Sequence, residues 1–211
     1  KRLVQNYRYG FINLAQDKVY KTALNDDLEV ISVLDSMNKY FPKENLPLEA
    51  SQNLLLAETI YKPIGDNTNY NKIIYELANN ELFNNNIAIE LKIEIIRILS
   101  IIDGLSPLFI KSINNFFEIY SLTIEHEMYL ATFLYQSLSL DDFNYLYDNV
   151  FNKYLSLETE VILLQTISET DNANLIEQTT LRIFNKFFNI NKQFNFELQK
   201  YIGDNISKYL T

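Results

Sequence analysis

The sequence predicts an all-α protein built from stacked antiparallel helix pairs, and three observations support this prediction. Only four Gly and four Pro interrupt 211 residues, which favours long helices joined by short loops over a turn-rich β architecture. Apolar residues recur at helical spacing along most of the chain. A short stretch also repeats, since residues 150–155 read VFNKYL and residues 183–188 read IFNKFF. Such self-similarity is typical of helical repeat architectures.

The repeat has a period close to 34 residues. Phe117 precedes Phe151 by 34 residues, and Phe151 precedes Phe184 by 33. The first helix of each predicted pair opens on an apolar residue followed by Glu. These openings, which are 41, 35 and 33 residues apart, are Leu48-Glu49, Ile89-Glu90, Ile124-Glu125 and Leu157-Glu158. The unit is therefore a helix pair of variable length, whose second apolar face is covered by the next pair.

This drifting apolar spacing resembles HEAT and armadillo-type helical repeats over residues 48–210, and it lacks the Trp and Leu-Gly pattern of tetratricopeptide repeats. The resemblance implies an α-solenoid, which is a superhelix of stacked pairs. We expect residues 1–211 to form one such segment of a longer protein, because the chain starts at Lys1 without Met. The predicted elements are an N-terminal helix pair over 3–41, repeat-like pairs over 48–83, 87–121, 123–155 and 157–189, and a final helix over 191–210.

Several helix starts can be predicted from single residues. Pro47 is expected at the first position of its helix, because a helix start leaves that N–H unpaired anyway. Pro107 is expected to start a later helix in the same way. Hydroxyl side chains, which accept hydrogen bonds from the first turn, predict caps at Ser106, Thr123, Ser139 and Ser156.

Acidic residues recur near the start of the first helix in each predicted pair. Glu90, Glu125 and Glu158 fall in first turns, where a negative charge complements the helix dipole. An acidic groove is the alternative interpretation of these residues. Glu127 and Glu160, two positions further on, add support to that alternative.

Composition and charge limit the partners and the compartment. The net charge is −9 and no cluster of Lys or Arg appears, so nucleic acid and anionic membranes are not expected partners. A basic protein or peptide suits this surface better, although the charge also serves solubility alone. The apolar run Ile87–Ile102 contains four charged residues and cannot span a membrane. The absence of Cys and of a signal peptide indicates an intracellular protein of the cytoplasm or nucleus.

No residue pattern indicates catalysis, a metal or a cofactor. His126 lies between two Glu residues, but the second His of the zinc-protease motif is absent because Leu130 stands there. The carboxylate pairs Asp26-Asp27 and Asp141-Asp142 occupy predicted helix starts, where capping explains them. A phosphate-binding glycine loop and a nucleophile elbow are also absent. We therefore expect a protein that is not an enzyme and that has no cofactor.

Three polar residues are the candidate partner-binding residues. Glu118, Asn152 and Asn185 occupy aligned positions on the second helices, each one residue past a core Phe. Equivalent positions of a solenoid form a line along one surface, so we call these three residues the polar ladder. A solvated face is the alternative interpretation.

The sequence thus favours a protein–protein interaction scaffold or adaptor segment of a larger intracellular assembly, which binds a partner helix or peptide along its groove. The alternative is a helical-repeat, peptide-sensing domain of a bacterial transcription regulator. An enzyme on a helical-repeat scaffold, such as a DNA glycosylase, is a third hypothesis, which the net charge of −9 disfavours.

Overall fold

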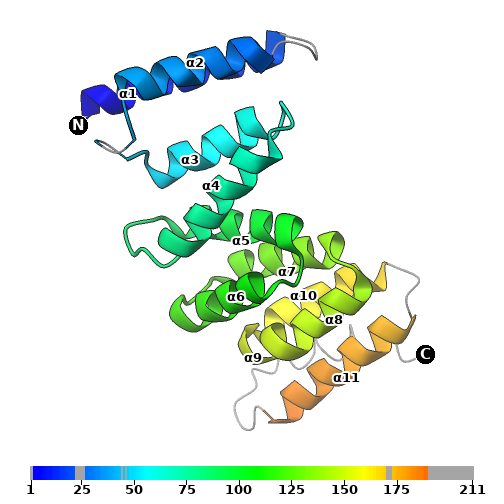
Figure 1. Ribbon diagram of the computed structural model, residues 1–211. Coiled ribbons are helices and arrows are strands. Elements are labelled where there is room, and N and C mark those ends of the chain that lie inside the picture. Colours follow the sequence, from blue (N-terminus) through cyan, green and yellow to red (C-terminus); the bar gives the residue numbers. More distant parts are fainter. Residues whose placement is uncertain (1, 22–26, 44, 46, 170–172, 190–211) are drawn as a thin grey trace. The chain divides into compact units, whose positions relative to one another are not determined.

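The computed structural model describes residues 2–21, 27–43, 45, 47–169 and 173–189, and every regular element among them is a helix (Figure 1). The prediction of an all-α protein is therefore confirmed. The chain forms two compact units, Lys1–Ile102 and Asp103–Thr211. Within each unit the helices pack on their neighbours in the chain, which is compatible with a helical repeat. The final helix predicted over 191–210 lies outside the described residues.

The helices of the first unit begin with a long pair, α1 and α2, which lie side by side (Figure 1). Arg8 of α1 is fully buried, and its Nη2 donates to the carbonyl oxygen of Phe41 at 2.8 Å, just past the end of α2. The ring of Tyr7 stacks on Phe41 at a centroid distance of 5.9 Å. The elements of this unit are α1 (Arg2–Lys21), α2 (Asp27–Tyr40), α3 (Ala50–Leu56), η1 (Ala57–Tyr61), α4 (Asn67–Asn80) and α5 (Ile89–Asp103).

The start of α3 differs from the prediction. Pro47 is not the first helical residue, because α3 begins at Ala50 with Glu49 as its N-cap. The Gln52 side chain accepts from the Glu49 backbone N–H at 3.2 Å, which forms a capping box. Gln5 of α1 also donates to the Glu49 carboxylate at 3.2 Å, so the helix start is fixed by a contact across 44 residues.

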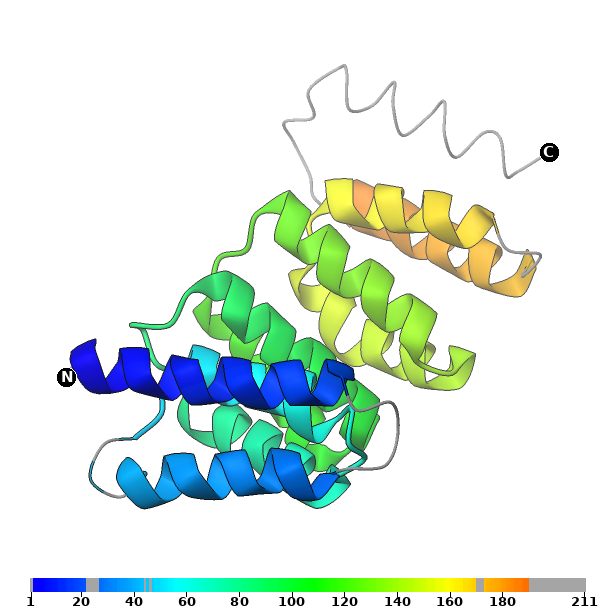
Figure 2. The ribbon, with the colours of Figure 1, turned by 90° about the horizontal axis from the view of Figure 1, so that it is seen from above.

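The second unit contains the helices around which the candidate site is built. Hydroxyl caps predicted for this unit are confirmed, since Ser106, Thr123, Ser139 and Ser156 each accept a backbone N–H of the following first turn. Helices α10 and α11 lie side by side (Figure 2). The elements are α6 (Pro107–Ile119), α7 (Ile124–Ser137), α8 (Leu140–Leu146), η2 (Tyr147–Phe151), α9 (Asn152–Tyr154), α10 (Leu157–Ser168) and α11 (Ala173–Asn189).

Each unit contains a five-residue π-helical turn, η1 or η2, inside a helix that the sequence predicts to be continuous. A π turn inserts one residue into the helix and occurs often at functional sites. The η2 turn places Tyr147 inward, with none of its surface exposed, and leaves its neighbour Asp148 exposed. Around it, Phe117, Phe143 and Phe151 form the aromatic core of the second unit.

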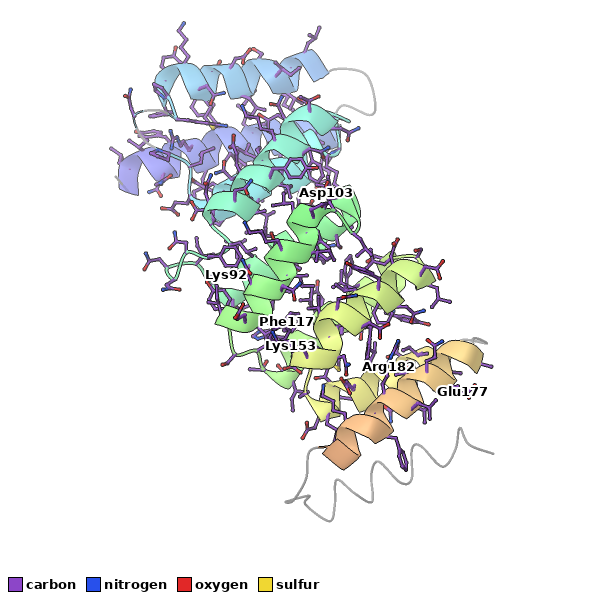
Figure 3. All side chains as sticks on the ribbon, turned by 60° about the horizontal axis from the view of Figure 1, so that its bottom comes forward. Lys92, Asp103, Phe117, Lys153, Glu177 and Arg182 are labelled. Carbon is purple, nitrogen blue, oxygen red and sulfur yellow. The ribbon has the colours of Figure 1, made fainter. Side chains whose placement is uncertain are left out.

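In three helices, each the first of a predicted pair, the fourth residue has an ionisable side chain that is buried. These residues are Lys92 in α5 (labelled in Figure 3), Glu127 in α7 and Glu160 in α10, exposed by only 2%, 8% and 0%. Buried charges are rare unless they are paired. Glu127 and Glu160 are paired in this way, since Glu127 accepts hydrogen bonds from Ser156 and Glu160 forms an ion pair with Lys186.

Candidate functional site

Glu127 fixes α7 against α10. Its Oε2 accepts three hydrogen bonds from the start of α10: from the Ser156 N–H at 2.9 Å, the Ser156 hydroxyl at 2.6 Å and the Thr159 hydroxyl at 2.8 Å. Hydrogen bonds to a charged group are the stronger kind. The two helix starts are thereby held together, so the helices run in the same direction along their contact.

A groove with a volume of about 390 Å³ lies between these two parallel helices, and we call it the α7–α10 groove. Its floor and walls are mainly apolar, and Tyr129 at its edge keeps 47% of its surface exposed. The lining residues are Met128, Tyr129, Thr132, Phe133 and Gln136 of α7 with Ile162 and Thr166 of α10. An apolar groove with a few polar groups is the usual character of a binding site.

The charges around the groove are acidic. Residues 121–137 and 156–169, which include both helices, contain no Lys or Arg. Glu125 precedes the lining residues Met128 and Tyr129 by one helical turn, and Glu158 precedes Ile162 in the same way. At the other end Glu169, which is exposed, follows Thr166 by one turn. The groove is thus apolar along its length and negative at both ends.

A buried ion pair behind the groove joins α10 to α11. The Glu160 carboxylate is fully buried, and its Oε1 accepts from Lys186 Nζ at 2.7 Å. The same Lys186 ammonium donates to the carbonyl oxygen of Leu155 at 2.7 Å. Burial raises the pKa of the Glu160 carboxyl, and the nearby Lys186 only partly opposes this rise. Glu160 therefore costs free energy in its charged form, and Lys186 reduces that cost.

Tyr147 and Arg182 complete this buried cluster. The Arg182 guanidinium lies 4.6 Å from the centroid of the Tyr147 ring, and its Nη2 lies 2.7 Å from Asp148 Oδ1. Figure 3 labels Arg182 on α11. Burial and the negative charge of Glu160 raise the pKa of the Tyr147 hydroxyl. The hydroxyl interacts with the carboxylate electrostatically, but neither Tyr147 Oη nor Glu160 Oε2 makes a hydrogen bond of ordinary geometry.

This buried cluster has a structural role. Neither Tyr147 nor Glu160 has exposed surface, so no substrate reaches them without local opening. The ionic contacts instead fix α11 against α10 and η2, and Glu160 lies one helical turn from Ser156, which Glu127 contacts. The residues of this cluster therefore stabilise the position of α10, one of the two helices that form the α7–α10 groove.

The structure places the polar ladder away from the groove, which contains none of its three residues. Glu118 at the end of α6 and Asn152 at the start of α9 are exposed, and the Asn185 side chain lies outside the described residues. Figure 3 labels Phe117, the residue before Glu118, and Lys153, the residue after Asn152. A hydrogen bond with Tyr154, and to a lesser extent the charge of Glu118, raises the pKa of Lys153. Lys153 is thus a cation next to the ladder, whose binding role stays a prediction.

Two acidic residues that supported an acidic groove do not line one. Glu127 and Glu160 are buried and engaged in the contacts given above, so that part of the interpretation is wrong. Their burial follows from their place on the inner side of α7 and α10, opposite the exposed Glu125. Glu90, Glu125 and Glu158 do lie in first turns, as predicted.

Metal binding and membrane insertion find no support within the described ranges. Those residues include no group of three or more His, Asp and Glu side chains placed to hold a metal ion. Their helices are each too short or too polar to span a bilayer. His126, singled out in the sequence, is half-buried in the first turn of α7, where its backbone N–H donates to the Thr123 cap at 3.3 Å.

Comparisons with family models, curated proteins and solved structures found no match for this chain.

Proposed function

We propose that this chain is an α-solenoid segment of a larger intracellular assembly, which acts as a non-catalytic scaffold and binds a partner helix or peptide in the α7–α10 groove. The groove is the observation that supports the proposal most directly, because it is apolar and open along two parallel helices. Tyr129 and Phe133 offer aromatic contact surface, which is the kind that contributes most to binding energy at protein interfaces.

Two further features support a scaffold of repeated helix pairs. The buried ionisable side chain recurs at the fourth position of α5, α7 and α10. The Glu127 contact joins one first helix directly to the next, which is how stacked repeats cover each other's faces. Because the Glu127 contacts already hold α7 against α10, a partner should not need to bring these two helices together when it binds, which limits the ordering cost.

A peptide-sensing domain of a bacterial transcription regulator is the second candidate. Its ligand would occupy the same groove, whose volume of about 390 Å³ lies in the range of small-ligand sites. The two candidates differ in what they bind. A scaffold binds a helix that contacts the whole groove, whereas a sensor binds a few extended residues.

A display library of peptides of about 16 residues, long enough for a helix of about 24 Å, tests the proposal on the intact chain. The selected peptides are then measured against Thr132→Arg, which obstructs the groove, and against Asn38→Arg, which adds the same charge at an exposed site of α2 in the first unit. We expect Thr132→Arg to weaken binding at least about 10-fold and Asn38→Arg to leave it unchanged.

The remaining outcomes contradict the proposal in different ways. Loss of binding only in Glu118→Lys/Asn152→Lys/Asn185→Lys would move the binding surface from the groove to the polar ladder. Selected peptides of three to five residues, bound without helical structure, would favour the sensor. A library that yields no specific binder would contradict the scaffold itself.

A further inference from the structure

We propose that the partner of the α7–α10 groove is a basic amphipathic helix, which places apolar side chains in the groove and Lys or Arg side chains over its acidic ends. This inference rests on the proposed function and adds the chemistry of the partner. It depends on the shape of the groove, on the charges at its two ends, and on the ion pairs that already engage Arg182 and Lys186.

The shape of the groove favours a helix over an extended chain. An extended strand gains affinity by pairing with a free sheet edge, and the described residues include no strand. A helix instead presents side chains at i, i+4 and i+7 along one line. The lining residues Tyr129, Phe133 and Gln136 extend along two turns of α7, so a helix lying along α7 meets them with several of its own side chains. Met128 adds a flexible side chain that adapts to the shape of an apolar partner residue.

The distribution of charge favours cations on that helix. Because α7 and α10 run in the same direction, their carboxyl ends lie at one end of the groove, where two helix dipoles are negative. Glu169, the exposed C-cap of α10, adds a full negative charge there. At the other end Glu125 and Glu158 each carry a full charge, which exceeds the positive half-charge of each helix start. Both ends therefore attract cations.

The two described cations of α11 are already paired and do not neutralise these ends. Arg182 and Lys186 belong to α11, which packs on α10, and they pair with Asp148 and Glu160. The acidic charges of Glu127 and Glu160 are engaged inside the unit. The charges that remain for a partner are thus the three exposed or half-buried carboxylates at the groove ends, and an acidic helix would be repelled by them.

Two synthetic peptides of about 16 residues test the inference on the intact chain. Both have Leu at i, i+4, i+7 and i+11, and their other positions carry Lys in one peptide and Glu in the other. Fluorescence anisotropy measures their dissociation constants at about 0.05 and 0.3 M salt. We expect the Lys peptide to bind at least about 10-fold more tightly than the Glu peptide, with a preference that decreases at high salt.

Charge-reversal variants locate the effect. Glu125→Lys/Glu169→Lys reverses the exposed charges at the groove ends. Asp35→Lys/Glu76→Lys makes the same change in net charge at exposed sites of the first unit. The first variant is expected to lose at least about 10-fold in affinity for the Lys peptide, and the second to keep the affinity within about 2-fold. Circular dichroism confirms that both variants stay folded.

The outcomes separate this inference from the proposed function. Tighter binding of the Glu peptide, lost in Thr132→Arg, would overturn the basic partner and retain the groove as a binding site. Equal loss in both charge-reversal variants would show a general charge effect and overturn the inference. If neither peptide binds the wild-type chain, the inference is also overturned, and the library selection alone decides the proposed function.

Discussion

The carboxylate of Glu127 accepts hydrogen bonds from both the backbone N–H and the hydroxyl of Ser156, at 2.9 and 2.6 Å. One side chain of α7 thereby holds Ser156, the N-cap residue of α10. This contact fixes the direction and separation of the two helices that form the groove. The stability of the second unit and the shape of its candidate site thus depend on the same residue.

Glu127→Ala is expected to lower the free energy of unfolding by about 2–3 kcal/mol, because buried donors of Ser156 and Thr159 lose a charged acceptor. Urea denaturation of the intact chain measures the change. Glu118→Ala, which removes an exposed carboxylate, is the matched control and should change stability by less than about 0.5 kcal/mol. Equal midpoints for the two variants would show that the Glu127 contact contributes nothing.

Lys186→Met is expected to destabilise the chain by about 3 kcal/mol, because the buried Glu160 loses its ion-pair contact with the Lys186 ammonium. The double variant Glu160→Leu/Lys186→Met removes both charges and should regain most of that loss. Thermal unfolding of the two variants beside the wild-type chain measures this recovery. A double variant less stable than the single one would mean that the ion pair itself stabilises the fold.

The stability should also depend on pH through Glu160, whose pKa is raised above the ordinary value of 4.5 by burial. A raised pKa means that the folded chain binds this proton more tightly than the unfolded chain, so the group contributes less stability as pH rises through the folded pKa. Relative to Glu160→Gln, the wild-type chain should therefore become less stable as pH rises above about 4.5. A constant difference across that range would contradict the burial of a charged carboxylate.

Two tyrosines predict opposite effects of removing a hydroxyl. The Tyr70 hydroxyl donates to Glu58 Oε1 at 2.6 Å, so Tyr70→Phe should cost about 1.5 kcal/mol. The buried Tyr147 hydroxyl makes no hydrogen bond of ordinary geometry, so Tyr147→Phe should leave stability unchanged or raise it by up to about 1 kcal/mol. Urea midpoints of both variants provide the comparison. A clear loss in Tyr147→Phe would reveal a partner for that hydroxyl.

Two glycines also predict opposite effects, here of adding a Cβ atom. Gly10 lies inside α1 with nothing within 4 Å of an added Cβ, so Gly10→Ala should stabilise the chain by about 0.5–1 kcal/mol. Gly65 has a φ of 73°, so Gly65→Ala should destabilise it by about 1 kcal/mol. Differential scanning calorimetry measures both shifts. Shifts of the same sign would contradict either the helical state of Gly10 or the turn at Gly65.

Local chemistry made most helix starts predictable from the sequence. Ser156 and Thr123 are hydroxyl residues placed just before an apolar helical pattern, and a cap needs only the next three residues to form. Pro47 was misleading because two contacts from other residues, Gln5 and Gln52, fix the start of α3 at Glu49 instead. The π turns were not predictable, since the apolar stripe through Tyr147 and Phe151 fits a regular helix equally well.

The candidate site could be predicted only in part. Glu127 and Ser156 are 29 residues apart in the sequence, and no local pattern predicts that they are in contact. Tyr129 and Phe133 are four residues apart on α7, a spacing that indicates a second apolar face. The core residues Leu130 and Leu134 are adjacent in the sequence and have the same spacing, so the sequence alone does not separate the two faces. The side of α7 that forms a groove depends on where α10 packs.

Methyl NMR tests the assignment of the α7–α10 groove most directly, because the chain contains only two methionines. Met128 lines the groove, and Met37 is buried in the first unit. With both methyl groups labelled with ¹³C, titration with the Lys peptide should shift the Met128 signal and leave the Met37 signal in place. Saturation of the peptide without a shift at Met128 would contradict the groove as the binding site.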